Sequence, residues 1–280
     1  MKPLVWIASY PKSGNTWMRL ALTSLLNGGA SVDINSFKRS GDTSSFNRTI
    51  FDDLVGMESS ELTEEEILNA RPGAFRLWAA EGGGPYLLKV HEAYIDTPGG
   101  EPLFPAEVSR AGIHIVRDPR DVAVSAVRLY GTDIDAVIAR MAKPDHVQSA
   151  NSYQLNTTLP QPLSSWSGHA ESWMDRPSFP VLTLRYEDML TDTATALRRA
   201  ADIIGITASD AVIAGAVAAT RFDALRRQEE QQGFHENWSR TTELFFRRGV
   251  AGGWRDDLTP AQADRIVADH RPMMERLGYL

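Results

Sequence analysis

The sequence predicts an α/β fold, a single domain over residues 1–280 with a central parallel β-sheet flanked by helices. Short apolar segments of strand length occur at residues 4–8, 86–91, 112–117 and 180–186. Segments with apolar residues at helical spacing lie between them, and no repeat or linker divides the chain. Strands that alternate with helices along a whole chain are typical of parallel sheets, because each parallel pair needs a crossover connection.

The first strand leads through a short loop into the first helix. Residues 4–8 form an apolar run that suits a strand buried on both faces. After the loop, apolar residues recur at i, i+3, i+4 and i+7 of a helix, at Met18, Ala21, Leu22 and Leu25. The loop therefore lies at a helix N-terminus, where unpaired N–H groups and the helix dipole attract an anion.

The composition of this loop favours phosphate. Lys12 supplies a full positive charge, and Gly14 lets the backbone approach a ligand closely. The hydroxyls of Ser13 and Thr16 can donate to phosphate oxygens. The pattern is not a Walker motif, because the lysine precedes the glycine and no earlier glycine closes the turn. An ordinary strand-to-helix connection is the alternative reading.

Composition narrows the class of protein. The chain has 42% hydrophobic and 23% charged residues, as in ordinary globular proteins. Its formal net charge of -7 argues against a nonspecific nucleic-acid binder. The lack of cysteine excludes disulfides, thiolate metal sites and cysteine nucleophiles. The first apolar run is interrupted too early for a secretory signal, and residues 211–219 reach about half a membrane span, so we expect a cytoplasmic protein without a membrane span.

The segment before the second strand contains isolated aromatic residues. Residues 27–62 are mixed in composition, and each of Phe37, Phe46 and Phe51 either packs on the core or lines a substrate pocket. Residues 63–66 resemble a capping box that opens a helix to about residue 70.

The second strand, at residues 86–91, carries two polar residues at its end. Lys89 and His91 alternate with apolar residues along it, so they share a face at the end of the strand where α/β sheets bind ligands. A structural, hydrogen-bonded His91 is the alternative.

The third strand also ends in a basic residue. Arg117 follows the strand at 112–117, Asp118 is placed to cap the next helix, and Pro119 takes its first position. Ser125 lies about two turns into that helix. An arginine binds phosphate bidentately. A surface pair of Arg117 with Asp118 or Asp121 is the alternative.

The remaining chain supplies two polar segments and further helices. Residues 143–165 and 228–244 are polar and long for connectors, as in lids and acceptor pockets. Arg247 and Arg248 precede Gly249, which suits anion binding by side chains and backbone together. Helices are expected at 166–175, 193–204, 210–219, from residue 220 onward, and from a capping box at 259–262 to about residue 278.

These turns together resemble the cytosolic type of sulfotransferase that depends on 3′-phosphoadenosine 5′-phosphosulfate (PAPS). The family's loop YPKSGTTW is matched by residues 10–17, with Asn15 in place of the first threonine. Its Arg and Ser eight residues apart are matched by Arg117 and Ser125. Its RKGxxGxW motif is matched by residues 247–254, with Arg248 in place of lysine. The resemblance implies a P-loop NTPase-like fold and transfer of a sulfuryl group from PAPS to an acceptor hydroxyl or amine.

The resemblance also implies roles for individual residues. His91 is the catalytic base, and Lys12 and Lys89 stabilise charge on the transferred group. The 5′-phosphosulfate is bound by residues 12–17, namely Lys12, Ser13, Gly14, Asn15, Thr16 and Trp17. The 3′-phosphate is bound by Arg117, Ser125, Arg247, Arg248 and Gly249. The adenine is contacted by Trp17, Tyr186, Thr220 and Phe222. The product is adenosine 3′,5′-bisphosphate (PAP), and no metal ion is expected, because the other histidines lack ligand spacing.

Two other functions fit parts of the pattern. A P-loop kinase or nucleotide hydrolase would need ATP and Mg²⁺, and a degenerate nucleotide-binding protein would not need Lys12, Lys89 and His91 together. The acceptor is a small molecule that the sequence does not identify, and no nucleic-acid partner is expected. The family's dimer motif is matched only in part, by Arg255, Thr259, Pro260 and Asp264, so a homodimer is an open possibility.

Overall fold

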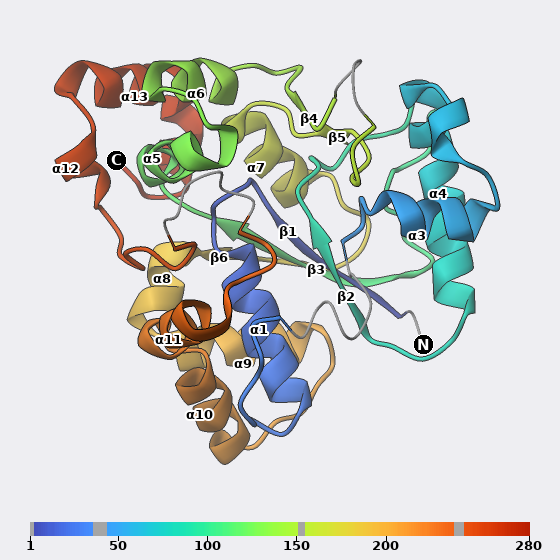
Figure 1. Ribbon diagram of the computed structural model, residues 1–280, viewed down its shortest axis with the longest axis horizontal. Helices are drawn as coiled ribbons and strands as arrows, with labels where there is room; N and C mark the ends of the chain where they lie inside the picture. The colour runs from blue at the N-terminus through green and yellow to red at the C-terminus, as the bar shows by residue number, and fades with distance from the viewer. Residues whose placement is uncertain (1–2, 36–43, 151–154, 238–243) are drawn as a thin grey trace.

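Four parallel strands form the central sheet of the computed structural model, which describes residues 3–35, 44–150, 155–237 and 244–280 (Figure 1). Their spatial order is β2 (Tyr86–Val90), β1 (Leu4–Ser9), β3 (Ser109–Val116) and β6 (Val181–Arg185). All six residues of β1 are buried, as the apolar run predicts. Because β2 and β3 lie on opposite sides of β1, the strand order reverses there, and such a point in an α/β sheet is where ligands bind.

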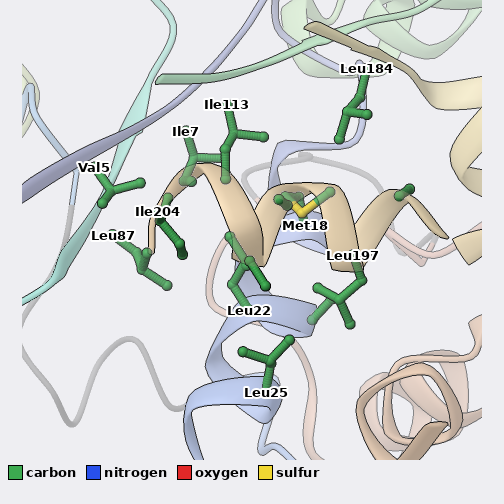
Figure 2. Close-up of a cluster of buried hydrophobic side chains, with 14 of the residues drawn as sticks. Val5, Ile7, Met18, Leu22, Leu25, Leu87, Ile113, Leu184, Leu197 and Ile204 are labelled. Atoms are coloured by element: carbon green, nitrogen blue, oxygen red, sulfur yellow. The ribbon is translucent and has the colours of Figure 1, made fainter. Parts of the chain in front are cut away.

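One face of the sheet is covered by α1 (Asn15–Leu26), α9 (Thr193–Ile203) and α10 (Asp210–Ala219). Figure 2 shows side chains of the strands, such as Val5 and Ile113, facing those of α1 and α9. The predicted apolar stripe of the first helix is confirmed, since its four residues are at most 3% exposed. The phosphate-type loop is therefore held between a buried strand and a buried helix.

The opposite face packs against α4 (Glu64–Ala80) and α7 (Trp166–Asp175). Trp6 of β1 points to this face, where it contacts Phe75 and Phe104 and donates from Nε1 to Ser109 Oγ at 2.7 Å. Successive side chains of β1 thus belong to two different hydrophobic clusters, because side chains along a strand point alternately to its two faces. A third cluster joins α5 (Pro119–Tyr130), α6 (Ile134–Met141) and α13 (Pro260–Arg276).

The other elements are short or lie at the surface. They are α3 (Arg48–Val55), the 3-10 helix η1 (Ser59–Glu61), β4 (Val147–Gln148), β5 (Gln161–Pro162), α8 (Tyr186–Thr191), α11 (Phe222–Gln232) and α12 (Trp254–Asp257). The helices in the described ranges include none that is both long and apolar enough to cross a lipid bilayer.

The predicted strands and most predicted helices are confirmed, and the exceptions have local causes. The capping boxes at Thr63 and Thr259 are present, and Asp118 caps α5. The expected end of α4 near residue 70 is wrong, because the helix continues through Pro72 and buries Phe75 and Trp78 against the sheet. Residues 228–232 are helical rather than part of a loop, since α11 extends to Gln232.

Candidate functional site

A single cavity of about 910 Å³ brings the predicted site residues together. It is bordered by the loop after β1, by the end of β2 and by the turn after β3, all of which lie at the carboxyl end of the sheet. Every residue that the sequence analysis assigns to catalysis or donor binding lines this cavity, with the exception of Ser13. Segments far apart in the chain therefore converge on one place.

The loop between β1 and α1 has the backbone of an anion-binding turn. Lys12 has a φ of 70° and Gly14 a φ of 108°, so the chain enters the left-handed region twice within three residues. A Cβ atom at Gly14 would lie 2.8 Å from Cδ2 of Tyr186, which excludes any larger residue there. Ser13 of this loop is fully buried, and its hydroxyl has no hydrogen-bond partner in the part of the chain described. Such a turn directs successive backbone N–H groups toward one point.

The side-chain amide of Asn15, the residue that departs from the family's loop motif, donates its hydrogen bonds within the protein. Its Nδ2 donates to the carbonyl of Ile7 at 2.6 Å and to Ser9 Oγ at 3.3 Å. The side chain therefore fastens the loop to β1 and does not face a ligand with its donor group. The assignment of Asn15 to donor binding consequently rests on its backbone alone.

Arg117 connects the first loop to the last one. Its guanidinium donates to the carbonyl of Lys12 at 3.1 Å and to that of Val250 at 3.2 Å, and its Nε has no partner in the described residues. The group lies 4.4 Å above the ring of Tyr186. The alternative pairing is not seen, because Asp118 pairs with Arg120 at 2.8 Å.

Asp121 holds the loop that contains the two arginines. Its carboxylate accepts from the backbone N–H of Gly252 at 2.7 Å and from that of Trp254 at 2.9 Å, and the side chain is 4% exposed. Gly249 has a φ of 61°, and a Cβ atom there would lie 2.3 Å from the ring of Phe222. Arg248 is held by Asp257 at 2.7 Å. Sequence reasoning considered Asp121 only as a partner for Arg117, and its role as an anchor was missed.

Aromatic side chains line the same cavity as these loops. The rings of Trp17 and Tyr186 are 5.8 Å apart in an edge-to-face arrangement. Nε1 of Trp17 donates to the carbonyl of Thr220 at 3.0 Å, which joins α1 to the start of the α11 region. Phe222 lines the same part of the cavity. These side chains are suited to stacking on a purine.

His91 is buried at the end of β2 with a defined tautomer. Its Nδ1–H donates to the carbonyl of Ser9 at 2.9 Å, because a carbonyl can only accept, and this leaves the Nε2 lone pair free to accept a proton. Burial, together with the charge of Lys89, lowers the pKa of His91 to about 3. The ring of Phe46 stacks on it at 5.8 Å, and Phe46 lines the cavity, whereas Phe51 packs in the core.

Two lysines line the cavity, Lys12 from the loop after β1 and Lys89 from β2. Nζ of Lys89 lies 2.9 Å from Glu236, and Nζ of Lys12 lies 4.2 Å from the ring centre of Phe245. Burial and the nearby charges of Arg117 and Lys89 lower the pKa of Lys12 to about 8. Glu236 was missed by sequence reasoning, because a lone acid in a polar segment carries no signal.

Both polar segments contribute to the cavity wall. Gln148, Ser149, Gln161 and residues 155–158 come from the first, and Glu236, Asn237 and Leu244 from the second. Phe37, residues 151–154 and residues 238–243, which belong to the predicted loops, lie outside the described residues. In the described ranges, no cluster of three or more histidine or carboxylate side chains is arranged to hold a metal ion.

Comparisons with known proteins agree on one family. The sequence model of the protein family described as the sulfotransferase domain matches residues 109–278 of this chain. Sulfotransferase 1A1 of Canis lupus familiaris is 25% identical over 278 residues, covering 97% of this chain and 83% of the relative. Sulfotransferase 1E1 of Bos taurus is 24% identical over 276 residues, covering 96% and 82%.

Solved structures share the fold. A crystal structure of retinol dehydratase in complex with androsterone and the inactive cofactor PAP has a TM-score of 0.64 and 19% identity, covering 98% of this chain and 81% of the other. Mouse sulfotransferase SULT7A1 complexed with PAP has a TM-score of 0.60 and 19% identity, covering 96% and 85%. At these identities the likeness concerns the arrangement of strands and helices.

Proposed function

This chain belongs to the PAPS-dependent sulfotransferase family, and we propose that it moves the sulfuryl group of PAPS to a hydroxyl or amine of a small molecule by in-line displacement, with His91 as general base. The observation that carries the proposal is the convergence of the family's separate motifs on one cavity. Family membership accounts for the class of enzyme, and the roles of the individual residues are our proposal.

The residues present fit a donor with phosphates at both its 3′ and 5′ positions. Nε of Arg117, which lines the cavity, is a buried donor without a hydrogen-bond partner in the described part of the chain, and a phosphate oxygen would supply one. The loop at residues 12–17 would hold the 5′-phosphosulfate, and the close approach of Gly14 to Tyr186 leaves room there only for a backbone without a side chain. Arg117, Ser125 and the loop at 247–249 would hold the 3′-phosphate.

The adenine would lie against the part of the cavity wall that contains Trp17, Tyr186, Thr220 and Phe222. Arg117 stacks on Tyr186, so the groups assigned to the adenine and to the 3′-phosphate support one another. When bound, PAPS supplies an activated sulfuryl group with PAP as its leaving group.

The chemistry assigned to the protein is proton removal and charge stabilisation. His91 accepts the proton of the acceptor hydroxyl at Nε2, while its Nδ1–H bond to Ser9 fixes the ring. Its lowered pKa keeps the imidazole neutral near pH 7, as a base must be. Lys12 and Lys89 stabilise the negative charge that develops around the transferred group, and because the cavity is partly closed from water this effect is strengthened.

The acceptor is proposed to be a small molecule held between Phe46, Tyr130 and the wall formed by Gln148, Ser149, residues 155–158 and Gln161. Retinol dehydratase was crystallised with androsterone and with retinol, so that relative of similar fold accommodates hydroxylated apolar molecules. The polar side chains Gln148, Ser149 and Gln161 give this cavity hydrogen-bonding groups as well.

Thermal unfolding with three ligands tests the proposed donor. A ligand that binds only the folded chain stabilises it by RT ln(1 + [L]/Kd). We expect PAP to raise the unfolding temperature more than 5′-AMP, and ATP with Mg²⁺ to raise it least. A preference for ATP with Mg²⁺ would favour a P-loop kinase, and no response to any of the three would indicate a degenerate site.

A further inference from the structure

One carboxylate lies against the groups assigned to the transferred end of the donor. Glu236 accepts from Nζ of Lys89 at 2.9 Å, from NH1 of Arg19 at 2.7 Å and from the hydroxyl of Thr16 at 3.3 Å. The Arg19 side chain is fully buried, and those of Lys89 and Glu236 are 13% and 15% exposed. This is a nearly water-free cluster of two cations and one anion.

The fold places Glu236 in this cluster by fixing the chain around it. Phe234 is buried among Leu20, Ile34 and Phe246. Asn35 receives a hydrogen bond from the backbone N–H of His235 at 3.0 Å and donates to the carbonyl of Gly233 at 3.1 Å. The position of Glu236 is therefore fixed both by hydrogen bonds to its carboxylate and by contacts of the residues that precede it. An acidic residue of a solvated loop lacks such contacts.

The carboxylate is charged at any ordinary pH. Burial by itself raises the pKa of Glu236, but the ammonium of Lys89 and the guanidinium of Arg19 outweigh burial and lower it far below its usual value. One of the two positive charges is thereby neutralised before any ligand arrives. Lys89 still has two further N–H groups to offer a ligand.

This arrangement limits the charge that the neighbouring site accepts. A sulfuryl group carries one negative charge, whereas a terminal phosphate of the same shape approaches two near pH 7, because its second pKa is about 6. At an effective dielectric constant of about 20, a fixed carboxylate a few ångströms away disfavours the second charge strongly.

We propose that Glu236 is a positioning and specificity residue of the donor site, which orients Lys89 and selects a singly charged sulfuryl group over a doubly charged terminal phosphoryl group. The inference rests on the proposed function, because it requires Lys89 and Thr16 to face the transferred group. Glu236 acts through Lys89 and takes no part in the transfer itself.

Binding measurements with three nucleotides test this inference. The probes are PAP, PAPS and adenosine 3′-phosphate 5′-diphosphate, and calorimetry without an acceptor gives the dissociation constant of each. We expect the wild-type protein to bind PAPS more tightly than the diphosphate. Glu236→Gln, which keeps the shape and removes the charge, should reduce that ratio of affinities by about tenfold or more, since the extra charge is felt at short range.

A matched control separates this effect from the general charge of the protein. Glu230→Gln removes a carboxylate of α11 that pairs with Arg226 at 3.0 Å and is 47% exposed. The ratio of the affinities for PAPS and for the diphosphate should therefore be the same in this variant as in the wild type. An unchanged ratio in folded Glu236→Gln would overturn the inference. Failure of the wild type to bind PAP would instead overturn the proposed donor site, and the two failures are thus distinguishable.

The wild-type protein supplies a second test if Glu236→Gln does not fold. Lowering the pH from about 7.0 to about 5.5 protonates most of the terminal phosphate and removes its second charge. The charged and titratable groups that face this end of the site are Lys12, Arg19, Lys89, His91 and Glu236. Over that range Lys12, with a pKa of about 8, stays mostly protonated, His91, with a pKa of about 3, stays neutral, and Glu236, whose pKa is lowered, stays ionised. The diphosphate should gain affinity relative to PAPS, and a constant ratio would contradict the inference.

Discussion

Replacing Asp121 by asparagine should weaken the binding of PAP without unfolding the protein. The carboxylate accepts two backbone N–H bonds, from Gly252 at 2.7 Å and from Trp254 at 2.9 Å. An asparagine has one acceptor oxygen, so one of the two N–H groups loses its partner and faces an NH₂ group instead. A hydrogen bond to a charged group contributes about 1.5–3 kcal/mol, and the loop at 247–254 therefore loses about 2 kcal/mol of its docking energy.

That loss should appear in the affinity for the 3′-phosphate. Because Arg247, Arg248 and Gly249 lie on the loosened loop, about 2 kcal/mol corresponds to a roughly 30-fold rise in the dissociation constant of PAP. The affinity for 5′-AMP, which has no 3′-phosphate, should change by less than about twofold under the same reasoning. Isothermal titration calorimetry with both nucleotides measures the two effects.

Asp256→Asn is the matched control, since Asp256 is an exposed carboxylate on the neighbouring α12. It should bind both nucleotides as the wild type does. If folded Asp121→Asn bound PAP with unchanged affinity, or lost PAP and 5′-AMP equally, the loop would not be the binding element for the 3′-phosphate and our assignment would be wrong.

Three further predictions concern the base, the last loop and the pH dependence of stability. His91→Gln should lower PAPS-dependent turnover by about 10²- to 10⁴-fold while PAP still binds, and normal turnover would exclude His91 as the base. Gly249→Ala should weaken PAP at least about tenfold, because the left-handed backbone is strained and the new Cβ meets Phe222. Gly131→Ala, at the same φ of 61° with open space around it, should keep the wild-type affinity, and equal losses in both variants would contradict the steric argument. The pKa values of His91 and His169 are lowered to about 3, so the unfolded chain binds more protons than the folded one at acidic pH. Stability should therefore fall from about pH 6.5 downward, by up to about 1.4 kcal/mol per pH unit for each histidine. A free energy of unfolding in urea that stays constant between about pH 7 and pH 5 would refute this.

Sequence patterns predicted the strands of the sheet because the length and polarity of a buried strand can be recognised within a short segment of the chain. The run at residues 4–8 has the length and polarity of a buried strand, and the motif that follows it identifies a helix N-terminus without further information. Phe46 was ambiguous, since a phenylalanine that packs on the core and one that lines a pocket look alike in sequence. In the structure Phe46 does both, being 5% exposed and stacked on His91.

The rest depends on contacts between distant residues. The length of α4 is decided by the burial of Phe75 and Trp78, which outweighs the presence of Pro72. Asp121 binds the backbone of a loop about 130 residues later in the chain, and Glu236 binds a lysine 147 residues earlier. A single sequence contains no period or spacing that could join such pairs.

The position of β1 between β2 and β3 has a consequence for the lifetime of the protein. A nucleotide that contacts loops from both ends of the chain is bound only when the whole sheet is in register, so a partly unfolded chain has nothing with which to retain it. At a ligand concentration 100 times Kd, binding adds about 2.7 kcal/mol to the free energy of global unfolding. The supply of nucleotide would then set not only the rate of turnover but also how long each copy of the chain survives proteolysis.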